Sequence, residues 1–267
     1  MKKFNAFTLA EVLITLAIVG VVAALTMPSL IQHHKKVETS AKIKKFNNTI
    51  NNWINLATVD YDNPEHWECS IERGNSMPHC IGKEKYINKY FKPYMNISKV
   101  IFDDFEIYYK DSCSKNEHEN QGGVSLLAMT GKLRGLQQTK PDYCGDSIFR
   151  GNTKIILNDG TTFYMDLSSM AIPVLYDTNG DKKPNQAGKD RFLFIFSGNT
   201  LPELACGFHA SKKRYFCADG NVNRSSTSTY GFPRDEALRY CGANGTLCSL
   251  VLEYDNWEFK DDYPIKL

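Results

Sequence analysis

The 267-residue chain lacks the short motifs that identify many enzymes. Its six histidines form no His-Glu-x-x-His pair, and it has neither a Gly-x-Ser-x-Gly nucleophile turn nor a phosphate-binding glycine loop. Its eight cysteines include no Cys-x-x-Cys pair, so the sequence does not favour a zinc ribbon. We therefore expect a structural role and no enzymatic activity.

The chain also lacks an excess of charge of either sign. It has 32 basic and 30 acidic residues, and removal of Lys2 and Lys3 would leave 30 of each. The chain therefore has no excess of positive charge that would attract a polyanion, and we expect no specific nucleic-acid site. The lysines between positions 35 and 45 are better explained as a solvated helix face or a contact with lipid headgroups.

A long apolar run is present near the N-terminus. It extends over 21 residues from Phe7 to Met27 and contains one ionisable residue, Glu11. As a helix this run would be about 31 Å long, which matches a bilayer core of about 30 Å. A charge inside such a segment is costly, so Glu11 is a candidate functional residue that needs a partner.

The residues before the run suggest that partner. Met1 to Ala6 form a short segment in which Lys2 and Lys3 favour a cytoplasmic location for this end. If a peptidase cut after Ala6, Phe7 would gain an amine four residues from Glu11. The amine and the carboxylate could then neutralise each other, within one chain or between neighbours.

This pattern resembles the prepilin leader of type IV pilins and type II secretion pseudopilins over residues 1 to about 31. The resemblance implies that a prepilin peptidase/N-methyltransferase cleaves after Ala6 and methylates Phe7. It also implies that Glu11 guides docking by contacting a neighbour's N-terminus. Ala6 departs from the family pattern, which usually has Gly there, whereas Pro28 stands where many pilins have a helix-kinking proline.

Two simpler interpretations remain open for the N-terminus. An ordinary secretory signal peptide would also have a lysine-bearing start and an apolar core, and Val22-Ala23-Ala24 is a weak cleavage site. A plain membrane anchor is the other alternative. Glu11 argues against both, because neither gains anything from a charge near the start of its apolar core.

The sequence and the resemblance predict an α+β, pilin-like fold. A long N-terminal helix over 7–58, with a transmembrane segment at 7–27, would pack on a mainly antiparallel β-sheet head. We divide the chain into a leader (1–6), this helix, and a disulfide-rich head (59–267). Beyond Pro28 a helical period continues through an apolar stripe of Val37, Ala41, Phe46, Ile50, Trp53 and Ala57.

Several strands can be placed in the head. Two β-rich runs between Lys154 and Leu167 flank Asp159-Gly160, which predicts a hairpin. Further strands are predicted over 172–176 and 191–197, and 248–254 is another apolar run. The segment 65–150 contains few clear turn signals. Within it we expect a short helix over 84–94 and a strand over 100–109.

All eight cysteines lie beyond the apolar run, which suits disulfide formation in an oxidising compartment. The simplest hypothesis pairs sequence neighbours, and buried free thiols are the alternative. The four predicted pairs are Cys69–Cys80, Cys113–Cys144, Cys206–Cys217 and Cys241–Cys248.

A loop after position 176 could hold a cation. Asp177, Asn179 and Asp181 alternate, and their oxygens together with those of Asp190 could converge on Ca²⁺. The glycine position does not fit an EF-hand, and a turn held by Asx hydrogen bonds without metal is the alternative. Several pseudopilins carry calcium in a loop of this region, and the ending at 257–264 also resembles that of pilin-like heads.

Together these features predict a pilin-like structural subunit that polymerises into a type II secretion pseudopilus or a type IV pilus. Its expected partners are the prepilin peptidase/N-methyltransferase, other pilin-type subunits and the bacterial inner membrane. The chain would cross this membrane once, with the N-terminus cytoplasmic and the head exported. A monomeric membrane-anchored binding or adhesive domain is the main alternative, and a tethered enzyme is a third.

Overall fold

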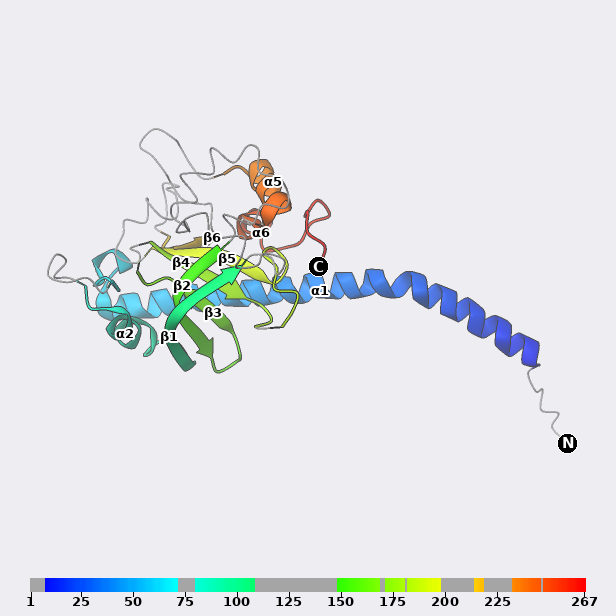
Figure 1. Cartoon of the computed structure of the whole chain (residues 1–267), viewed down its shortest axis with the longest axis horizontal. Helices are drawn as coiled ribbons and strands as arrows, with labels where there is room; N and C mark the ends of the chain where they lie inside the picture. The colour runs from blue at the N-terminus through cyan, green and yellow to red at the C-terminus, as the bar shows by residue number, and fades with distance from the viewer. Residues whose placement is uncertain are drawn as a thin grey trace.

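The computed structural model consists of a head domain with one long helix projecting from it (Figure 1). It describes residues 8–71, 80–108, 148–168, 171–180, 182–197, 214–218, 232–245 and 247–267. The projecting helix, α1, covers Leu9–Tyr61 and is 53 residues long. The predicted α+β, pilin-like architecture is confirmed.

Helix α1 has two halves with different surroundings. The apolar side chains of its first half, from Leu9 to Ile31, are largely exposed. In the second half, residues at helical spacing are buried in the head: Ile43, Phe46, Ile50, Trp53, Ile54 and Ala57. Pro28 lies inside α1, where it removes one backbone hydrogen bond, and the N-terminal half of the helix curves (Figure 1).

The head is built on a six-stranded sheet in the order β1-β2-β3-β4-β5-β6, and each described neighbouring pair is antiparallel. The predicted hairpin is present as β2 and β3, with Gly160 at a φ of 84° in the turn. The strands are β1 (Ile97–Tyr108), β2 (Ile148–Leu157), β3 (Thr162–Met165), β4 (Ala171–Asp177), β5 (Arg191–Ser197) and β6 (Phe216–Ala218).

Short helical segments pack against α1 and the sheet. The segment that we expected to be one helix over 84–94 consists of α2 (Lys83–Tyr86) followed by a π-helical turn, η2 (Ile87–Phe91). The apolar run 248–254 is a helix, α6 (Cys248–Tyr254), which follows α5 (Arg234–Asn244). A 3₁₀ turn, η1 (Pro64–His66), follows α1. Both η1 and η2 contact α1, and α6 contacts β5 and β6.

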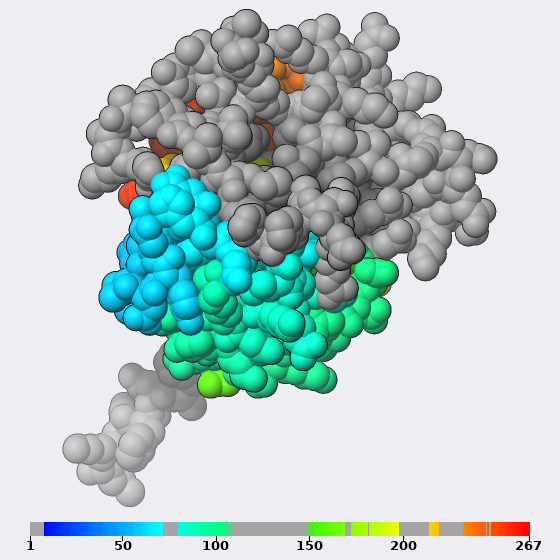
Figure 2. All heavy atoms as spheres, turned by 90° about the vertical axis from the view of Figure 1, so that its left-hand side faces the viewer, coloured from blue at the N-terminus to red at the C-terminus, as the bar shows by residue number. Residues whose placement is uncertain are grey.

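The core forms where the second half of α1 lies on the sheet. The ring of Phe46 stacks on that of Tyr176 at 4.1 Å, and Trp53, further along α1, packs on Phe196 at 5.0 Å. On β5, Phe194 packs on Phe46 and Phe196 packs on Trp53, so β5 runs away from the projecting half of α1. We call the end of the head where α1 emerges the base; it comprises the β4–β5 loop and residues 257–267. The opposite end, with α2 and η2, is the distal end (Figure 2).

Two of the predicted disulfides are confirmed. Cys69 is bonded to Cys80, and Cys241 to Cys248. Cys217 is also disulfide-bonded, with a partner that is not among the described residues. Cys113, Cys144 and Cys206, which belong to the other two predicted pairs, lie outside the described residues.

Candidate functional site

The N-terminus of α1 is closed by a reciprocal capping arrangement between Thr8 and Glu11. The backbone N–H and the hydroxyl of Thr8 both donate to Glu11 Oε2, each at 2.8 Å. In return, the backbone N–H of Glu11 donates to Thr8 Oγ1 at 3.3 Å. This is a capping box, in which two backbone donors of the first helical turn gain side-chain partners.

The capping box directs the Glu11 carboxylate towards the start of the helix. A negative charge there is favoured by the helix dipole. Ala6 and Phe7, the predicted cleavage and methylation residues, lie outside the described residues, but Phe7 immediately precedes Thr8 in sequence. The sequence interpretation missed Thr8, although the spacing Thr8-x-x-Glu11 is the pattern of a capping box.

The apolar half of α1 is long enough to cross a membrane, and it is not a core helix of the head. The most apolar window of α1 contains no buried residue. Leu13 and Val19, for example, are each about three-fifths exposed. An apolar surface of this extent requires a lipid or protein environment.

The second candidate site is the β4–β5 loop, where the carboxylates of Asp177 and Asp190 are buried. Asp190 accepts hydrogen bonds from the backbone N–H groups of Asn185 (2.7 Å) and Gln186 (2.6 Å) and from Nδ2 of Asn179 (3.0 Å). Three of the four predicted ligands, Asp177, Asn179 and Asp190, thus belong to one hydrogen-bonded cluster. The fourth, Asp181, lies outside the described residues.

The donors around these carboxylates compete with a cation. Asp177 accepts from the backbone N–H of Asn179 at 3.1 Å and from Arg191 Nε at 3.3 Å. Burial raises the pKa of Asp177 to about 6, although these two donors act in the opposite direction. Within the described part of the chain, no three His, Cys, Asp or Glu side chains are grouped as for a metal ion.

Two oxygens in the same loop are nevertheless open to a cation. The side-chain oxygens of Asn179 and Asn185 are buried and accept no hydrogen bond from any described residue. Both residues also donate to Oδ2 of Asp190, so they lie beside a carboxylate. Amide and carboxylate oxygens are the ligands that Ca²⁺ prefers, and an occupant would satisfy two buried acceptors.

An apolar helix with a capped N-terminus that projects from an antiparallel-sheet head defines the pilin-like class. A family model described as the prokaryotic N-terminal methylation motif matches residues 1–27, so the chain carries a prepilin-type leader. A second model, described as a family of unknown function (DUF6613), matches residues 29–267, and the chain belongs to this family. Neither a curated protein nor a solved structure gives a significant match to the chain.

Proposed function

We propose that this pilin-like protein is a subunit that polymerises through α1 into a type II secretion pseudopilus or a type IV pilus. The observation that carries the proposal is the methylation motif at residues 1–27, placed on a helix whose apolar half lies entirely outside the head. The leader 1–6 is removed at the cytoplasmic face by a prepilin peptidase/N-methyltransferase. The head is exported and remains tethered to the inner membrane until assembly.

Glu11 supplies the register of assembly in this proposal. After cleavage, the amine of Phe7 is adjacent to Thr8, whose backbone N–H and hydroxyl hold the Glu11 carboxylate. Inside a membrane that carboxylate is stabilised most by a positive partner, either its own Phe7 amine or that of a neighbour. Packing between apolar helices supplies the cohesion, and the ion pair selects the alignment.

The test is to substitute Glu11 in a host that has a pilus or pseudopilus assembly system. Glu11→Ala should keep normal membrane insertion and reduce incorporation into filaments at least about tenfold, since a pairing worth more than about 1.4 kcal/mol is lost. Thr15→Ala is the matched control, because the hydrogen bond that the Thr15 hydroxyl makes within the described part of the chain is to its own helix, at the Val12 carbonyl. Normal incorporation of Glu11→Ala would contradict the mechanism.

Mass spectrometry of the mature chain tests the processing step separately. A mature N-terminus at methylated Phe7 supports the proposal. A mature chain that starts near Leu25 would instead identify an ordinary signal peptide and would rule out the membrane-embedded helix.

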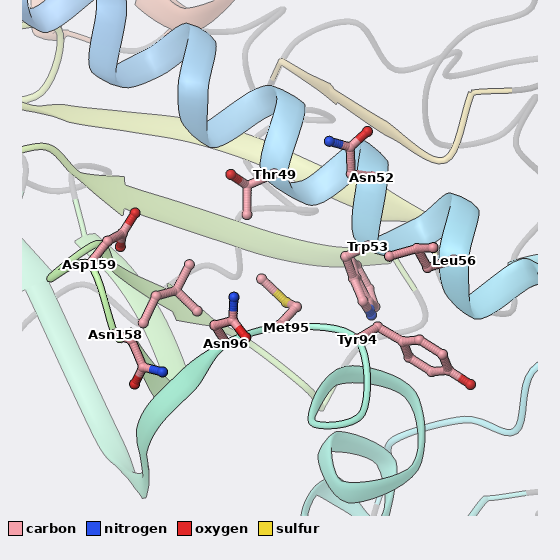
Figure 3. A pocket seen from close by; sticks show the side chains of 10 residues that line it. Thr49, Asn52, Trp53, Leu56, Tyr94, Met95, Asn96, Asn158 and Asp159 are labelled. Atoms are coloured by element: carbon pink, nitrogen blue, oxygen red, sulfur yellow. The ribbon is translucent and has the colours of Figure 1, made fainter.

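A groove in the head favours the second candidate function, a monomeric membrane-anchored binding domain. Its volume is about 290 Å³. In Figure 3, α1 forms one wall, and residues 94–96 and 157–159 form the other. The lining mixes polar and apolar side chains: Thr49, Asn52, Trp53, Leu56, Tyr94, Met95, Asn96, Leu157, Asn158 and Asp159. Co-purification with other pilin-type chains supports the polymerising subunit, whereas a stable monomer with a soluble ligand supports this alternative.

We also propose that the β4–β5 loop binds Ca²⁺ through Asp177, Asn179, Asp181 and Asp190. The buried side-chain oxygen of Asn179, which accepts no hydrogen bond from a described residue, supports this assignment. Millimolar calcium should raise the melting temperature of the chain, and Asp177→Ala should abolish that rise. Asp166→Ala is the control, because Asp166 caps the turn at Ser168 away from this loop. A wild-type melting temperature that does not change with calcium would contradict the proposed Ca²⁺ site.

A further inference from the structure

The base of the head carries six lysines for which no ion pair is formed among the described residues. All six are exposed or half-buried. We call them the basal lysines; they are Lys35 and Lys36 on α1, Lys182, Lys183 and Lys189 in the β4–β5 loop, and Lys266 in the C-terminal segment.

Contacts at the base bring these three segments together. The hydroxyl of Tyr176, at the end of β4, donates to the Lys42 carbonyl of α1 at 3.4 Å. The hydroxyl of Tyr263 donates to the Gly188 carbonyl at 2.6 Å, and Ser40 donates to the Trp257 carbonyl. The loop and the C-terminal segment therefore lie beside the part of α1 that leaves the head (Figure 1).

The acidic groups near the basal lysines are mostly neutralised by other cations. Glu38 pairs with Lys42 at 2.8 Å, and Glu258 pairs with Lys44 at 3.4 Å. Asp255 and Asp262 both pair with Arg234. Asp261 is the exposed acid at the base for which no such pair is formed in the described part of the chain. Asp190, in the β4–β5 loop, is buried and pairs with no described cation. The six basal lysines still outnumber Asp190 and Asp261, so the uncompensated charge of the described part of the base is positive, although the charge of the whole chain is balanced.

The position of the basal lysines on α1 fits a membrane surface. Lys35 and Lys36 follow Met27, the end of the apolar run, by eight and nine residues, or about 12–14 Å along a helix. The headgroup layer on one side of a bilayer is about 5–8 Å thick. The remaining gap is comparable with the Debye length of about 8 Å at physiological ionic strength, so Lys35 and Lys36 lie within electrostatic reach of the headgroups.

We propose that the base of the head binds anionic lipid headgroups through the basal lysines. This inference rests on the proposed membrane span, which holds the base close to the bilayer. The contact would keep the head against the membrane before polymerisation, and it would be released as the subunit is extracted into a filament. Lysine ammonium groups suit this role because they attract headgroup phosphates without a fixed geometry.

Lysine acetylation in nanodiscs tests the proposal with the full chain. The chain is placed in discs of phosphatidylcholine alone or with one-third phosphatidylglycerol, and acetylation rates are read by mass spectrometry. Lys182, Lys183, Lys189 and Lys266 should react at least about fivefold more slowly in the anionic discs, and high salt should remove the difference. Lys85 and Lys92, which are exposed at the distal end, should react equally in both.

A charge-reversal variant and the lipid control separate the possible outcomes. Lys182→Glu with Lys183→Glu should abolish the lipid-dependent protection of Lys189 and Lys266, whereas Lys85→Glu with Lys92→Glu should leave it unchanged. Equal rates for the wild type in both kinds of disc would overturn the headgroup contact while leaving the span intact. Failure of the chain to enter either kind of disc would overturn the span, and the headgroup contact with it.

Discussion

At Gly188 the β4–β5 loop lies close against the rest of the head. Its φ is 77°, and a Cβ atom built there would lie 2.4 Å from the sulfur of Cys248 and 2.5 Å from Cδ1 of Ile265. An alanine would therefore combine an unfavourable backbone conformation with a clash against a disulfide-bonded sulfur. Gly188→Ala should destabilise the head by about 2–5 kcal/mol.

Gly160 provides the matched control for that substitution. Its φ is 84°, but a Cβ there would meet no atom within 4 Å. Gly160→Ala should therefore destabilise the head by about 1–2 kcal/mol, the cost of placing an alanine at a positive φ. Thermal unfolding of the detergent-solubilised chain, followed by near-UV circular dichroism, compares the two. Equal losses of melting temperature would show that the packing around Gly188 is not tight.

The stability of the folded head should depend on pH through the carboxylate of Asp255. Burial alone would raise its pKa, but hydrogen bonds from Arg234 and Lys260 outweigh burial, and the pKa lies below its ordinary value. The side chain is 2% exposed, and its Oδ1 lies 2.8 Å from Arg234 Nε. A lowered pKa stabilises the folded state above about pH 4, and this contribution is lost as the pH falls below that value.

Asp255→Asn isolates this contribution. At pH 7 the variant should be less stable than the wild type by about 1–3 kcal/mol, because charge-assisted hydrogen bonds are weakened. Near pH 3 the gap should narrow, because the Asp255 carboxylate of the unfolded wild-type chain is then largely protonated, which favours unfolding. Melting temperatures at the two pH values provide the measurement. A gap of the same size at both values would assign the effect to packing instead of charge.

At the scale of elements, the sequence predicts most clearly where a hydrophobic period is long or a turn has special chemistry. The stripe through Phe46 and Trp53 predicts α1, and Asp159-Gly160 predicts the β2–β3 hairpin. Strand β5 has the predicted limits, 191–197. The run 248–254 allowed no such assignment, because seven residues of this kind fit a buried strand or a buried helix equally well; here they form α6.

The candidate sites were predictable only in part. The carboxylate of Glu11 stands out because it interrupts an apolar run. The oxygen-rich loop also stands out, but its sequence cannot reveal that backbone N–H groups of Asn185 and Gln186 bond to Asp190. Those donors depend on the path of the backbone, which contacts outside the loop help to fix. The Tyr263 hydroxyl, which bonds to Gly188 across 75 residues of sequence, is one of these contacts.

Phe46 links α1 to the sheet and is the best point at which to weaken this contact. It is 1% exposed, and its ring packs on those of Phe163, Tyr176, Phe194 and Phe216. Phe46→Ala should destabilise the head by about 3–5 kcal/mol. Asn48→Ala, on the exposed side of the same helix, should change the stability by less than about 0.5 kcal/mol. Similar melting temperatures for the two variants would contradict the described packing.

At the scale of the whole molecule, substitutions in the head should affect folding, and substitutions in the membrane-spanning half of α1 should affect assembly. The head holds α1 through hydrogen bonds that begin at Ser40 and through buried side chains that begin at Ile43. The apolar half from Leu9 to Ile31 has no residue buried in the head. Folding of the head and alignment in a filament therefore depend on different parts of one continuous helix.

A comparison of Glu11→Ala with Phe46→Ala tests this separation. Glu11→Ala should leave the melting temperature of the head within about 1 °C of the wild type, because its side chain bonds only to Thr8 in the described chain. It should nevertheless fail to assemble. Phe46→Ala should lower the melting temperature and leave the membrane-bound fraction unchanged, because the apolar half of α1 is intact. A loss of head stability in Glu11→Ala would mean that the span and the head fold as one unit. The assembly defect could then no longer be assigned to the ion pair alone.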